Sequence, residues 1–548
     1  MKAHFELKRL IRNIGNKSYD SYESIEGTYL FNNFVLFIEF VQKYSNDPPG
    51  RFRIKIDQEI AKFPPDTFSN RTREIALRDF LTRTFYDAIT EFSSDEFISF
   101  EYPGQEILER TSAFVDSSFV EVRFEVTLHT RGNILSNDDV EDFLLKRLPQ
   151  IVESSLIFDN LEEETLYKHI ETSEDADFLR NELENLRLIA FVAEGSSLPR
   201  ESKSSSLPMA TNAVTTFSSP ERLKMDVELP NKGQITGMGI PRGITLITGE
   251  QDSGKSTLLN AIQMGIYNHI PGDGREFVVS NPNSVKIRSE KGRSINNLDI
   301  SAFLPALEDA NCYSANHADN ITSEAANIIE AIEIGADVLL LDEDTSAPGF
   351  LLNTQEKAEN NSNEIVSLIP YIEKAKNLFR EYMISTIMVI ENPLGFYEEA
   401  DCVIRVNDKK AEDITLEIKN EGEHGGTNGI FGFIQERIPN FVNMGDLKEL
   451  DNIINENMAL FSKEDVAYIE QIVSVSQLNT IEKAIEYSKK YMDGKKTFRQ
   501  VTSLVMLDIG RAGLDILDLD LPGNHAEFRK IELVSALNRL NSLKVKQK

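Results

Sequence analysis

The chain has 548 residues, of which 41% are hydrophobic and 27% are charged. These values are typical of globular proteins, and the length suffices for two to four domains, which excludes a largely disordered chain. The 58 basic and 89 acidic residues give a formal charge of −31, which repels nucleic acids and anionic membranes at long range. A polyanionic partner would therefore need a local basic patch.

Cysteine usage and hydropathy indicate the compartment. Cys312 and Cys402 lie far apart without metal-type spacing, and the seven histidines form no cluster, a usage typical of reducing compartments. The strongest apolar run, Phe34–Phe40, contains Glu39 and is too short to span a bilayer, and the N-terminus has no apolar signal segment. We expect a cytoplasmic protein, or one of another reducing intracellular compartment, without a membrane domain.

Residues 1–195 mix helical and strand patterns. Between Ile75 and Ile89 apolar residues recur at helical spacing, and between Phe119 and Leu128 they alternate as in a half-buried strand. This mixture predicts an N-terminal α+β domain.

Four further regions follow. Residues 196–214 are rich in Ser and Pro and predict a linker or mobile loop, with a loop that reaches toward a ligand as the alternative. Residues 215–407 alternate apolar strands with helical stretches, the pattern of a mainly parallel α/β sheet. Residues 408–445 are polar and Gly-rich, which predicts an exposed insertion or a boundary. Residues 446–548 have a helical pattern and predict a C-terminal helical region.

A glycine-rich motif, G-x-x-x-x-G-K-S, runs from Gly249 to Ser256, directly after an apolar strand pattern and before a predicted helix that begins at Ser256. Phosphate oxygens need several converging donors, and glycines let backbone N–H groups and the helix N-terminus supply them. Lys255 adds a charge for the β- and γ-phosphates, Ser256 can offer its hydroxyl to Mg²⁺, and Thr257 can contact the α-phosphate. An ordinary Gly-rich loop is the alternative. The predicted nucleotide-binding residues are Gly249, Ser253, Gly254, Lys255, Ser256 and Thr257.

Two acids follow a second apolar strand pattern at Val338–Asp344. Because parallel strands end at one edge of a sheet, Asp342 and Glu343 are expected beside the glycine-rich loop. There Asp342 would support Mg²⁺, while Glu343 would polarise the attacking water and act with Lys255 in catalysis. A strand that merely ends in solvated acids is the alternative.

A short helix is predicted over residues 321–336, immediately before this strand. Thr322 or Ser323 is the expected N-cap, and Gly335 is the expected end. The helix N-terminus could attract phosphate, whereas a plain crossover helix would have no such role.

These motifs and several other stretches resemble the predicted ATPases of the ABC class over nearly the whole chain. The most specific stretch is GIYNHIPGDGREFV at Gly265–Val278. The others are GMGIP at Gly237–Pro241, DEDTSA at Asp342–Ala347, AFVAEGSSLPRES at Ala190–Ser202 and ALNRLNSL at Ala536–Leu543. The resemblance implies an α/β P-loop NTPase core of ABC type, an N-terminal α+β domain, a C-terminal helical region and a head-to-tail homodimer.

The resemblance also implies roles for single residues. The glycine-rich loop binds phosphate and metal, Asp342 holds Mg²⁺ and Glu343 is the catalytic carboxylate. Thr322 and Ser323 belong to a signature helix, whose N-terminus points at the γ-phosphate held by the second subunit.

The chain departs from the family pattern at several positions. Asn320 and Ile321 replace a Gly-Ser pair, and Glu324 stands where Gln is expected. After the strand 385–390, Glu391-Asn392-Pro393 replaces a Gly-rich stretch and supplies no His as a γ-phosphate switch. The glycine-rich loop itself contains the acids Glu250 and Asp252. These differences bear on turnover more than on nucleotide binding.

Three other features bear on the nucleotide site. Arg275 could reach a phosphate or the partner subunit, or it could pair with a carboxylate beside a tight Pro-Gly-Asp-Gly turn. Phe217 or another upstream aromatic residue could stack on adenine. Asn296–Asp299 resembles a guanine-reading motif, but it precedes the acidic strand, so GTP is not expected.

The N-terminal region is locally basic, which raises the question of RNA or DNA as a ligand. Its arginines could contact phosphates, or they could lie on solvated helix faces paired with acids such as Glu74 and Asp79. The resemblance favours a nucleic-acid platform somewhat. The arginines concerned are Arg51, Arg53, Arg71, Arg73, Arg78 and Arg83.

The leading hypothesis is therefore a homodimeric ATPase that uses ATP and Mg²⁺ and couples dimer closure to a ligand, with RNA or DNA as a candidate. The competing hypothesis is a nucleotide-gated binding or scaffold protein with little turnover.

Overall fold

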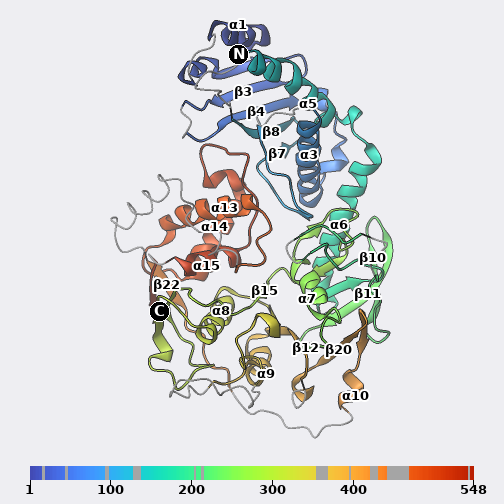
Figure 1. Cartoon of the computed structure of the whole chain (residues 1–548), viewed down its shortest axis with the longest axis vertical. Coiled ribbons are helices and arrows are strands. Elements are labelled where there is room, and N and C mark those ends of the chain that lie inside the picture. Colours follow the sequence, from blue (N-terminus) through green and yellow to red (C-terminus); the bar gives the residue numbers. More distant parts are fainter. Residues whose placement is uncertain are drawn as a thin grey trace. The chain divides into compact units, whose positions relative to one another are not determined.

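The computed structural model describes residues 1–14, 19–43, 47–92, 98–127, 137–202, 205–210, 215–352, 368–393, 397–419, 430–440, 468–540 and 543–548. The chain forms two compact units (Figure 1). Unit 1 comprises Met1–Glu174, Ser474–Thr480 and Ala512–Glu527, and unit 2 comprises Asp175–Val473, Ile481–Arg511 and Phe528–Lys548. The C-terminal part of the chain thus contributes to both units.

Unit 1 contains a mixed sheet in the order β1-β2-β3-β4-β8-β5, with β7 also paired to β8. The β1–β2 pair is parallel and the other pairs are antiparallel. The strands are β1 (Lys2–Ala3), β2 (Gly27–Leu30), β3 (Val35–Phe40), β4 (Gly50–Asp57), β5 (Ile98–Ser99), β7 (Ala113–Val115) and β8 (Phe119–Val126). The accompanying helices include α1 (His4–Ile14), α3 (Arg71–Phe92) and α5 (Leu148–Ser155).

One face of this sheet carries the core of unit 1. Along β4, Phe52, Ile54 and Ile56 are buried in alternation, as a half-buried strand requires. They belong to one apolar cluster with Leu77 and Phe85 of α3. Residues 75–89, predicted as helix, lie within α3, which packs beside β7 and α5 (Figure 1).

The prediction of a half-buried strand from Phe119 onward is wrong in one respect. The strand is present as β8, but Glu121 and Arg123, on its expected solvent face, are buried as well. Arg123 pairs with Asp515 at 2.6 Å, and a Cβ on Gly523 would lie 2.4 Å from the Arg123 carbonyl oxygen. A segment almost 400 residues later in the chain covers this face, and local alternation cannot reveal such a cover.

Unit 2 is built around a mainly parallel sheet in the order β15-β18-β19-β12-β20-β21. Neighbours are parallel except for β20 and β21, which form a hairpin. This is the parallel α/β sheet that the alternating pattern of 215–407 predicted. The strands are β12 (Ile244–Thr248), β15 (Ser284–Lys286), β18 (Val338–Asp342), β19 (Ser385–Val389), β20 (Cys402–Asn407) and β21 (Lys410–Asp413).

A second, antiparallel sheet in unit 2 has the order β10-β11-β9-β14. Its strands are β9 (Leu188–Ala193), β10 (Lys224–Leu229), β11 (Gly233–Pro241) and β14 (Val278–Ser280). The prediction placed β9 at the end of the N-terminal domain, and the structure pairs it with β11 and β14. Helix α7 (Lys255–Met264) shares one apolar cluster with both sheets, including Leu259, Ile240 and Leu340.

Parts of the predicted linker and insertion have defined contacts. Within 196–214, Ser197 N–H donates to the Gly274 carbonyl at 2.9 Å, and Arg200 pairs with Asp273 at 2.8 Å. Within 408–445 lie β21, the short helix α10 (Thr415–Lys419) and β22 (Arg437–Asn440). Residues 203–204, 211–214, 420–429 and 441–445 of these predictions lie outside the described residues.

The C-terminal region is mainly helical, as predicted, with α13 (Val475–Ser488), α14 (Phe498–Ala512) and α15 (Lys530–Arg539). The predicted stretch 446–467 lies outside the described residues. The chain then ends in a strand, β23 (Lys544–Gln547), that pairs with β22. No helix within the described ranges combines the length and apolar character needed to cross a membrane.

A buried ion pair anchors β22 inside unit 2. Arg437 is fully buried, and its guanidinium donates to Glu333 of α8 (Asn320–Ile334) at 2.8 and 2.9 Å. It also donates to the Asn296 carbonyl and to the side-chain oxygen of Asn538. The pair thereby joins α8 to the strand that holds the chain's C-terminal end.

Replacing Arg437 with Gln should destabilise unit 2 by about 3–5 kcal/mol, because it leaves the buried Glu333 carboxylate without its cation. The exposed Arg405–Glu412 pair is the matched control, since Arg405→Gln should cost no more than about 1 kcal/mol. Urea denaturation of the two variants and the parent measures the difference. Equal midpoints for both variants would contradict the assignment.

Candidate functional site

The two predicted motifs meet at one edge of the parallel sheet. Strand β19 lies between β12 and β18, and Val389 aligns with Ile247 on one side and with Asp342 on the other. The glycine-rich loop follows β12, and the acid pair consists of the last residue of β18 and the residue after it, so both lie at the carboxyl ends of the strands. Two strand spacings, about 10 Å, separate their backbones, a distance that phosphates and a metal ion can bridge.

The glycine-rich loop is shaped by close backbone packing. Gly249 and Gly254 adopt φ values of 140° and 110°, which side chains of L-residues rarely allow. A Cβ on Gly249 would lie 2.1 Å from the Val406 carbonyl oxygen of β20. The Ser253 hydroxyl is buried and has no hydrogen-bond partner in the described structure. The loop thus has the shape of an anion-binding cradle, and the Ser253 hydroxyl in it is a hydrogen-bond donor left unused within the described residues. Both features fit a phosphate ligand.

Lys255 and the residues after it stand where the phosphates would be bound. Helix α7 begins at Lys255, one residue before the predicted start, with Gly254 at its N-cap. The Lys255 ammonium donates to the carbonyls of Gly249 and Glu250 at 2.8 and 2.6 Å. Ser256 and Thr257 lie in the first turn of α7, where the helix dipole favours an anion.

The acid pair splits into a buried and an exposed carboxylate. Asp342 is 5% exposed and accepts a hydrogen bond from the Asp344 N–H at 3.1 Å. Glu343 is exposed, and its carboxylate accepts from the Glu391 N–H at 3.0 Å. The Glu391 carbonyl in turn accepts from Thr248 at the end of β12. Glu391, noted in the sequence for the missing histidine, therefore ties Glu343 to the strand before the glycine-rich loop through its backbone.

These residues fit a magnesium nucleotide. The Ser256 hydroxyl and the Asp342 carboxylate are hard oxygen ligands of the kind that Mg²⁺ prefers. Within the described ranges no three or more His, Cys, Asp or Glu side chains group as a metal site. The other ligands of Mg²⁺ would therefore be phosphate oxygens and water, as is usual at NTPase sites.

Helix α8 is the predicted short helix, but its N-cap is not Thr322 or Ser323. Asp319 caps the helix, and its carboxylate accepts from the Thr322 N–H at 2.8 Å. The helix ends at Gly335, as predicted, with φ 91°. Ser323 is fully buried, and its hydroxyl donates to the Asn320 carbonyl and accepts from the Glu290 N–H. Several cap-forming residues follow one another here, and spacing alone does not select among them.

Glu324 points into the interior of unit 2. Its side chain is fully buried, and one oxygen accepts from the Ala347 N–H at 2.6 Å, just beyond the acid pair. The other oxygen is buried without a partner in the described structure. Burial raises the pKa of Glu324 to about 7, although the Ala347 N–H and the Lys286 ammonium favour the charged form.

Lys286, at the end of β15, was not predicted as a site residue. Its ammonium donates to the Thr345 hydroxyl at 3.1 Å, two residues after Glu343. Burial lowers the pKa of Lys286, while Glu470 and Asp342 oppose that shift. The sequence signal for this residue is a lysine at the end of β15, the strand that pairs with β18, which carries the acid pair.

Arg275 and Phe217 have structural roles. Arg275 is buried and donates to the Leu198 carbonyl at 2.9 Å. Asp273 of the same turn pairs with Arg200 and His269. Phe217 is only 6% exposed within the apolar cluster of unit 2, so its ring is not free to stack on adenine.

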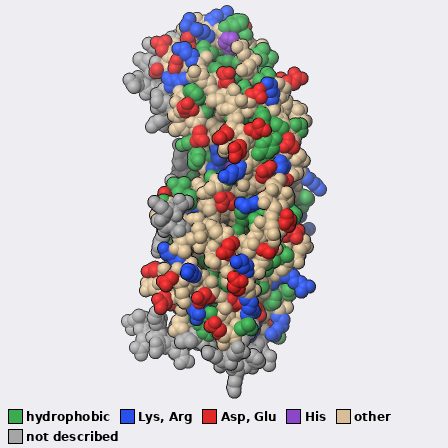
Figure 2. Space-filling view, turned by 90° about the vertical axis from the view of Figure 1, so that its right-hand side faces the viewer, with side chains coloured by type: hydrophobic (Ala, Val, Ile, Leu, Met, Phe, Trp, Pro, Cys, Tyr) green, Lys and Arg blue, Asp and Glu red, His purple; other side chains and the backbone are tan. Residues whose placement is uncertain are grey.

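The six N-terminal arginines all have carboxylate partners, but the predicted alternative of solvated helix faces holds only in part, because Arg51 and Arg53 lie on strand β4. Arg78 and Arg83 are buried, and Arg83 pairs with Asp79 at 2.7 Å. The remaining partners are Asp520 for Arg51, Glu39 and Glu121 for Arg53, Glu74 and Glu109 for Arg71 and Arg78, and Glu174 for Arg73. On the face drawn in Figure 2, basic and acidic side chains of the described residues are interspersed.

Glu324→Gln should stabilise the protein at pH 8 but not at pH 5. The folded protein binds the Glu324 proton more tightly than the unfolded chain, so the stability it contributes is complete below about 4.5 and is lost as pH rises toward about 7. The gain at pH 8 should be at most about 3 kcal/mol. Urea denaturation at both pH values measures it, with the exposed Glu373→Gln as control. An equal effect of Glu324→Gln at pH 5 and pH 8 would contradict the shifted pKa.

Family models match the chain in three consecutive segments. A P-loop domain model, ABC_ATPase, matches residues 162–429. The model of the N-terminal domain of ATPases of the ABC class matches residues 4–159. The MRB1590 C-terminal domain model matches residues 456–546. The first two models describe the same class and occur in the order that the resemblance implies.

Similar proteins cover parts of the chain. An uncharacterised protein of Methanocaldococcus jannaschii is 30% identical over 186 residues, which are 32% of this chain and 41% of that protein. A peptidyl-tRNA hydrolase of Clostridium perfringens is 38% identical over 88 residues, which are 15% of this chain and 46% of that protein. The chain thus spans less than half the length of these curated relatives. Among solved structures, the ABC transporter component CbiO1 of Clostridium perfringens has 14% identity and a TM-score of 0.27, covering 43% of this chain and 92% of its own.

The glycine-rich loop and the acid pair lie at one edge of a parallel sheet, in a segment matched by the P-loop domain model. The segment before it matches the N-terminal domain of the same class. The chain belongs to the family of ATPases of the ABC class.

Proposed function

We propose that this protein binds ATP with Mg²⁺ at the edge of the parallel sheet and hydrolyses it, and that nucleotide-driven closure of a head-to-tail homodimer acts on a ligand. Cys312 and Cys402 are both free thiols, which supports the proposed reducing, cytoplasmic-type location.

One observation carries the proposal. Val389 is flanked by Ile247, one residue from the end of β12, and by Asp342, the last residue of β18. This register brings the glycine-rich loop and the Asp342 carboxylate to the same edge, although they are almost 90 residues apart in the chain. It supports their proposed roles in binding phosphate and Mg²⁺. Neither motif alone would support hydrolysis.

The residues of the site have different roles in the proposed reaction. The N–H groups around Gly254 and the start of α7 receive phosphate oxygens, and Lys255 turns from the loop carbonyls to the β- and γ-phosphates. Ser256 and Asp342 would hold Mg²⁺, whose charge would offset the negative charge that develops on the phosphates. Glu343 orients the attacking water, and the Glu391 N–H keeps its carboxylate at the sheet edge.

Dimer closure would use the start of α8. Asn320 is exposed at the first turn, beside the capping Asp319. The Ser323 hydroxyl donates to the Asn320 carbonyl and accepts from the Glu290 N–H. It can donate to a partner's γ-phosphate only after it releases the Asn320 carbonyl, whereas the bond from Glu290 can remain. We infer that a closed dimer either presents the backbone of the first turn or repositions Ser323.

The competing proposal is a nucleotide-gated scaffold with little turnover. It is supported by the absence of a histidine at Glu391–Pro393 and by the engaged Ser323 hydroxyl. The two proposals make the same prediction for binding and opposite predictions for phosphate release.

Glu343→Gln should lower phosphate release by about 10²–10⁴-fold, because a general base or water-orienting carboxylate contributes that much to such reactions. Nucleotide affinity should stay near that of the parent, since Glu343 is exposed and outside the cradle. Steady-state phosphate release and fluorescent-nucleotide titration measure the two quantities. Equal release by parent and variant, with both binding ATP, would favour the scaffold.

A Lys255→Ala variant is the control for binding itself. The variant lacks the charge-assisted hydrogen bonds from the Lys255 ammonium to the phosphates, which contribute about 1.5–3 kcal/mol to binding. Its affinity for Mg-ATP should therefore be roughly 10- to 150-fold weaker. Unchanged affinity would overturn the nucleotide site as a whole.

RNA or DNA is one candidate for the ligand, and the ion pairs of the arginines determine what its binding would require. Because each of the six arginines already has a carboxylate partner, a phosphate must displace that partner in a chain of charge −31. We expect filter binding of single-stranded RNA to be detectable near 50 mM salt and lost near about 200 mM. No retention even at the lower salt would remove nucleic acid from the proposal.

A further inference from the structure

The segment that follows β15, residues 287–293, contacts three functionally different elements, and we call it the junction loop. It touches the loop that carries Glu343, because Ser289 donates to the Thr345 carbonyl through its N–H at 3.0 Å and through its hydroxyl at 3.1 Å. It touches α8, because the Glu290 N–H donates to the Ser323 hydroxyl at 2.9 Å. It touches α15 through the Glu290 side chain.

The contact with α15 is a buried, two-pronged ion pair. The Arg539 guanidinium donates to both carboxylate oxygens of Glu290, through Nε at 3.1 Å and through Nη2. The two side chains are 7% and 4% exposed. A third bond, from Nη1 to the Ser535 carbonyl at 2.7 Å, fixes the guanidinium on its own helix. A two-pronged ion pair of this kind leaves the two side chains little rotational freedom, so a movement of α15 should also move Glu290.

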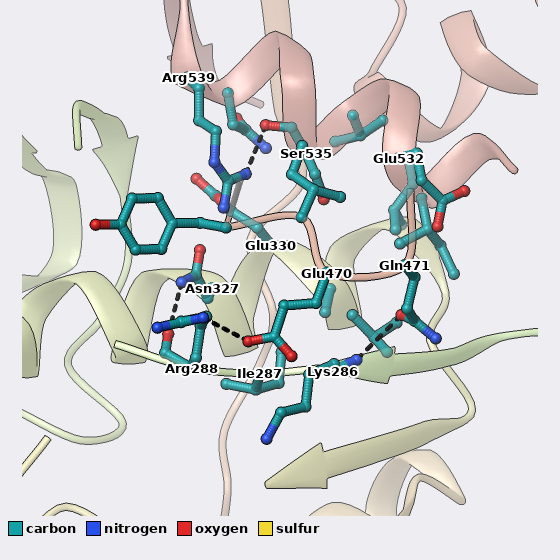
Figure 3. Close-up of a pocket in the computed structure, with 18 residues that line it drawn as sticks. Lys286, Ile287, Arg288, Asn327, Glu330, Glu470, Gln471, Glu532, Ser535 and Arg539 are labelled. Atoms are coloured by element: carbon teal, nitrogen blue, oxygen red, sulfur yellow. Dashed lines mark hydrogen bonds and ion pairs between the residues drawn. The ribbon is translucent and has the colours of Figure 1, made fainter. Parts of the chain in front are cut away.

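The junction loop is also fastened along the side of α8. The Asn327 amide donates to the Arg288 carbonyl at 2.9 Å, and Arg293 donates to both carboxylate oxygens of Glu330 at 2.8 and 2.9 Å. Figure 3 shows Arg539 extending from α15 toward Glu330 and Asn327, with Arg288 beside Glu470 on the near side. The junction loop and α8 are therefore connected at several points and should move together.

We propose that Arg539 is a positioning residue for ATP hydrolysis: through Glu290 it sets the Ser323 hydroxyl on α8 and, through Ser289, the Thr345 end of the loop that carries Glu343. The C-terminal helix α15 is thereby coupled to the catalytic loop and to the signature helix at once. The inference rests on the proposed function, because it concerns the turnover of the same site. Arg539 has no role in the cradle that binds the nucleotide.

The first test compares Arg539→Gln with Lys530→Gln. Lys530 lies at the start of the same helix and is partly exposed, so it controls for the loss of one positive charge from α15. Arg539→Gln should lower kcat about tenfold and change the Kd for Mg-ATP less than about twofold, the size expected for a coupling residue without ligand contact. Lys530→Gln should change neither. Unchanged kcat in Arg539→Gln, or a parallel loss of affinity, would overturn the proposal.

The second test asks whether Arg539 acts through Ser323. In a double-mutant cycle, Arg539→Gln combined with Ser323→Ala should lower kcat little more than the larger single loss, because both changes break the same relay. Arg539→Lys keeps the charge but not the two-pronged ion pair, and should fall between parent and Arg539→Gln. Additive losses would mean that Arg539 only supports the fold, and would overturn the relay.

A third measurement does not depend on turnover. Amide hydrogen exchange of peptides covering 287–293 and 320–326 should be faster in Arg539→Gln than in Lys530→Gln at equal nucleotide saturation. If the parent protein releases no phosphate, the proposed function fails, and this exchange difference still decides the coupling. Equal exchange in the two variants would overturn it.

Discussion

The pairing of β19 with both β12 and β18 is the constraint on which the rest of unit 2 depends. It aligns Val389 with Ile247 and Asp342, so a loop of backbone donors and a buried carboxylate lie at one edge of the sheet. A one-residue slip in either ladder would move the side chains of the slipped strand, including Asp342 in β18, to the opposite face of the sheet. The apolar faces of all three strands, buried in one cluster with α7, resist such a slip.

Around this edge, much of the surrounding structure is held by buried charges. Glu290, Glu330 and Glu333 each meet an arginine from another segment, namely Arg539, Arg293 and Arg437. Buried pairs pay a large desolvation penalty and stabilise little in net terms, yet breaking one is costly. Their effect is specificity, because α8 is held in one register against the junction loop, β22 and α15. A helix held in this way moves with its partners, which is why we connect the C-terminal region to catalysis.

The sequence-based predictions succeeded where local pattern and chemistry coincide. The strands before Gly249 and at Val338–Asp342, and the helix that ends at Gly335, are present because each is specified by its own apolar periodicity and end signals. They failed where the deciding partner is remote. The expected solvent face of β8 is covered by a segment almost 400 residues later in the chain. The role of Lys286 likewise depends on Thr345, 59 residues away. The N-cap of α8, by contrast, was missed for a local reason, because Asp319, Thr322 and Ser323 can all cap a helix and Asp319 does so here.

By itself the sequence determined the class of fold and the kinds of residue at the site. A glycine-rich loop between strand and helix, and two acids after a buried strand, have few other uses, since phosphate and Mg²⁺ demand those groups. Only the tertiary structure decided which hydroxyl is engaged, which arginines are neutralised and which helix is linked, through Glu290 and Ser289, to the loop that carries Glu343. Those outcomes follow from ion pairs and hydrogen bonds across long sequence separations, for which no local spacing rule exists.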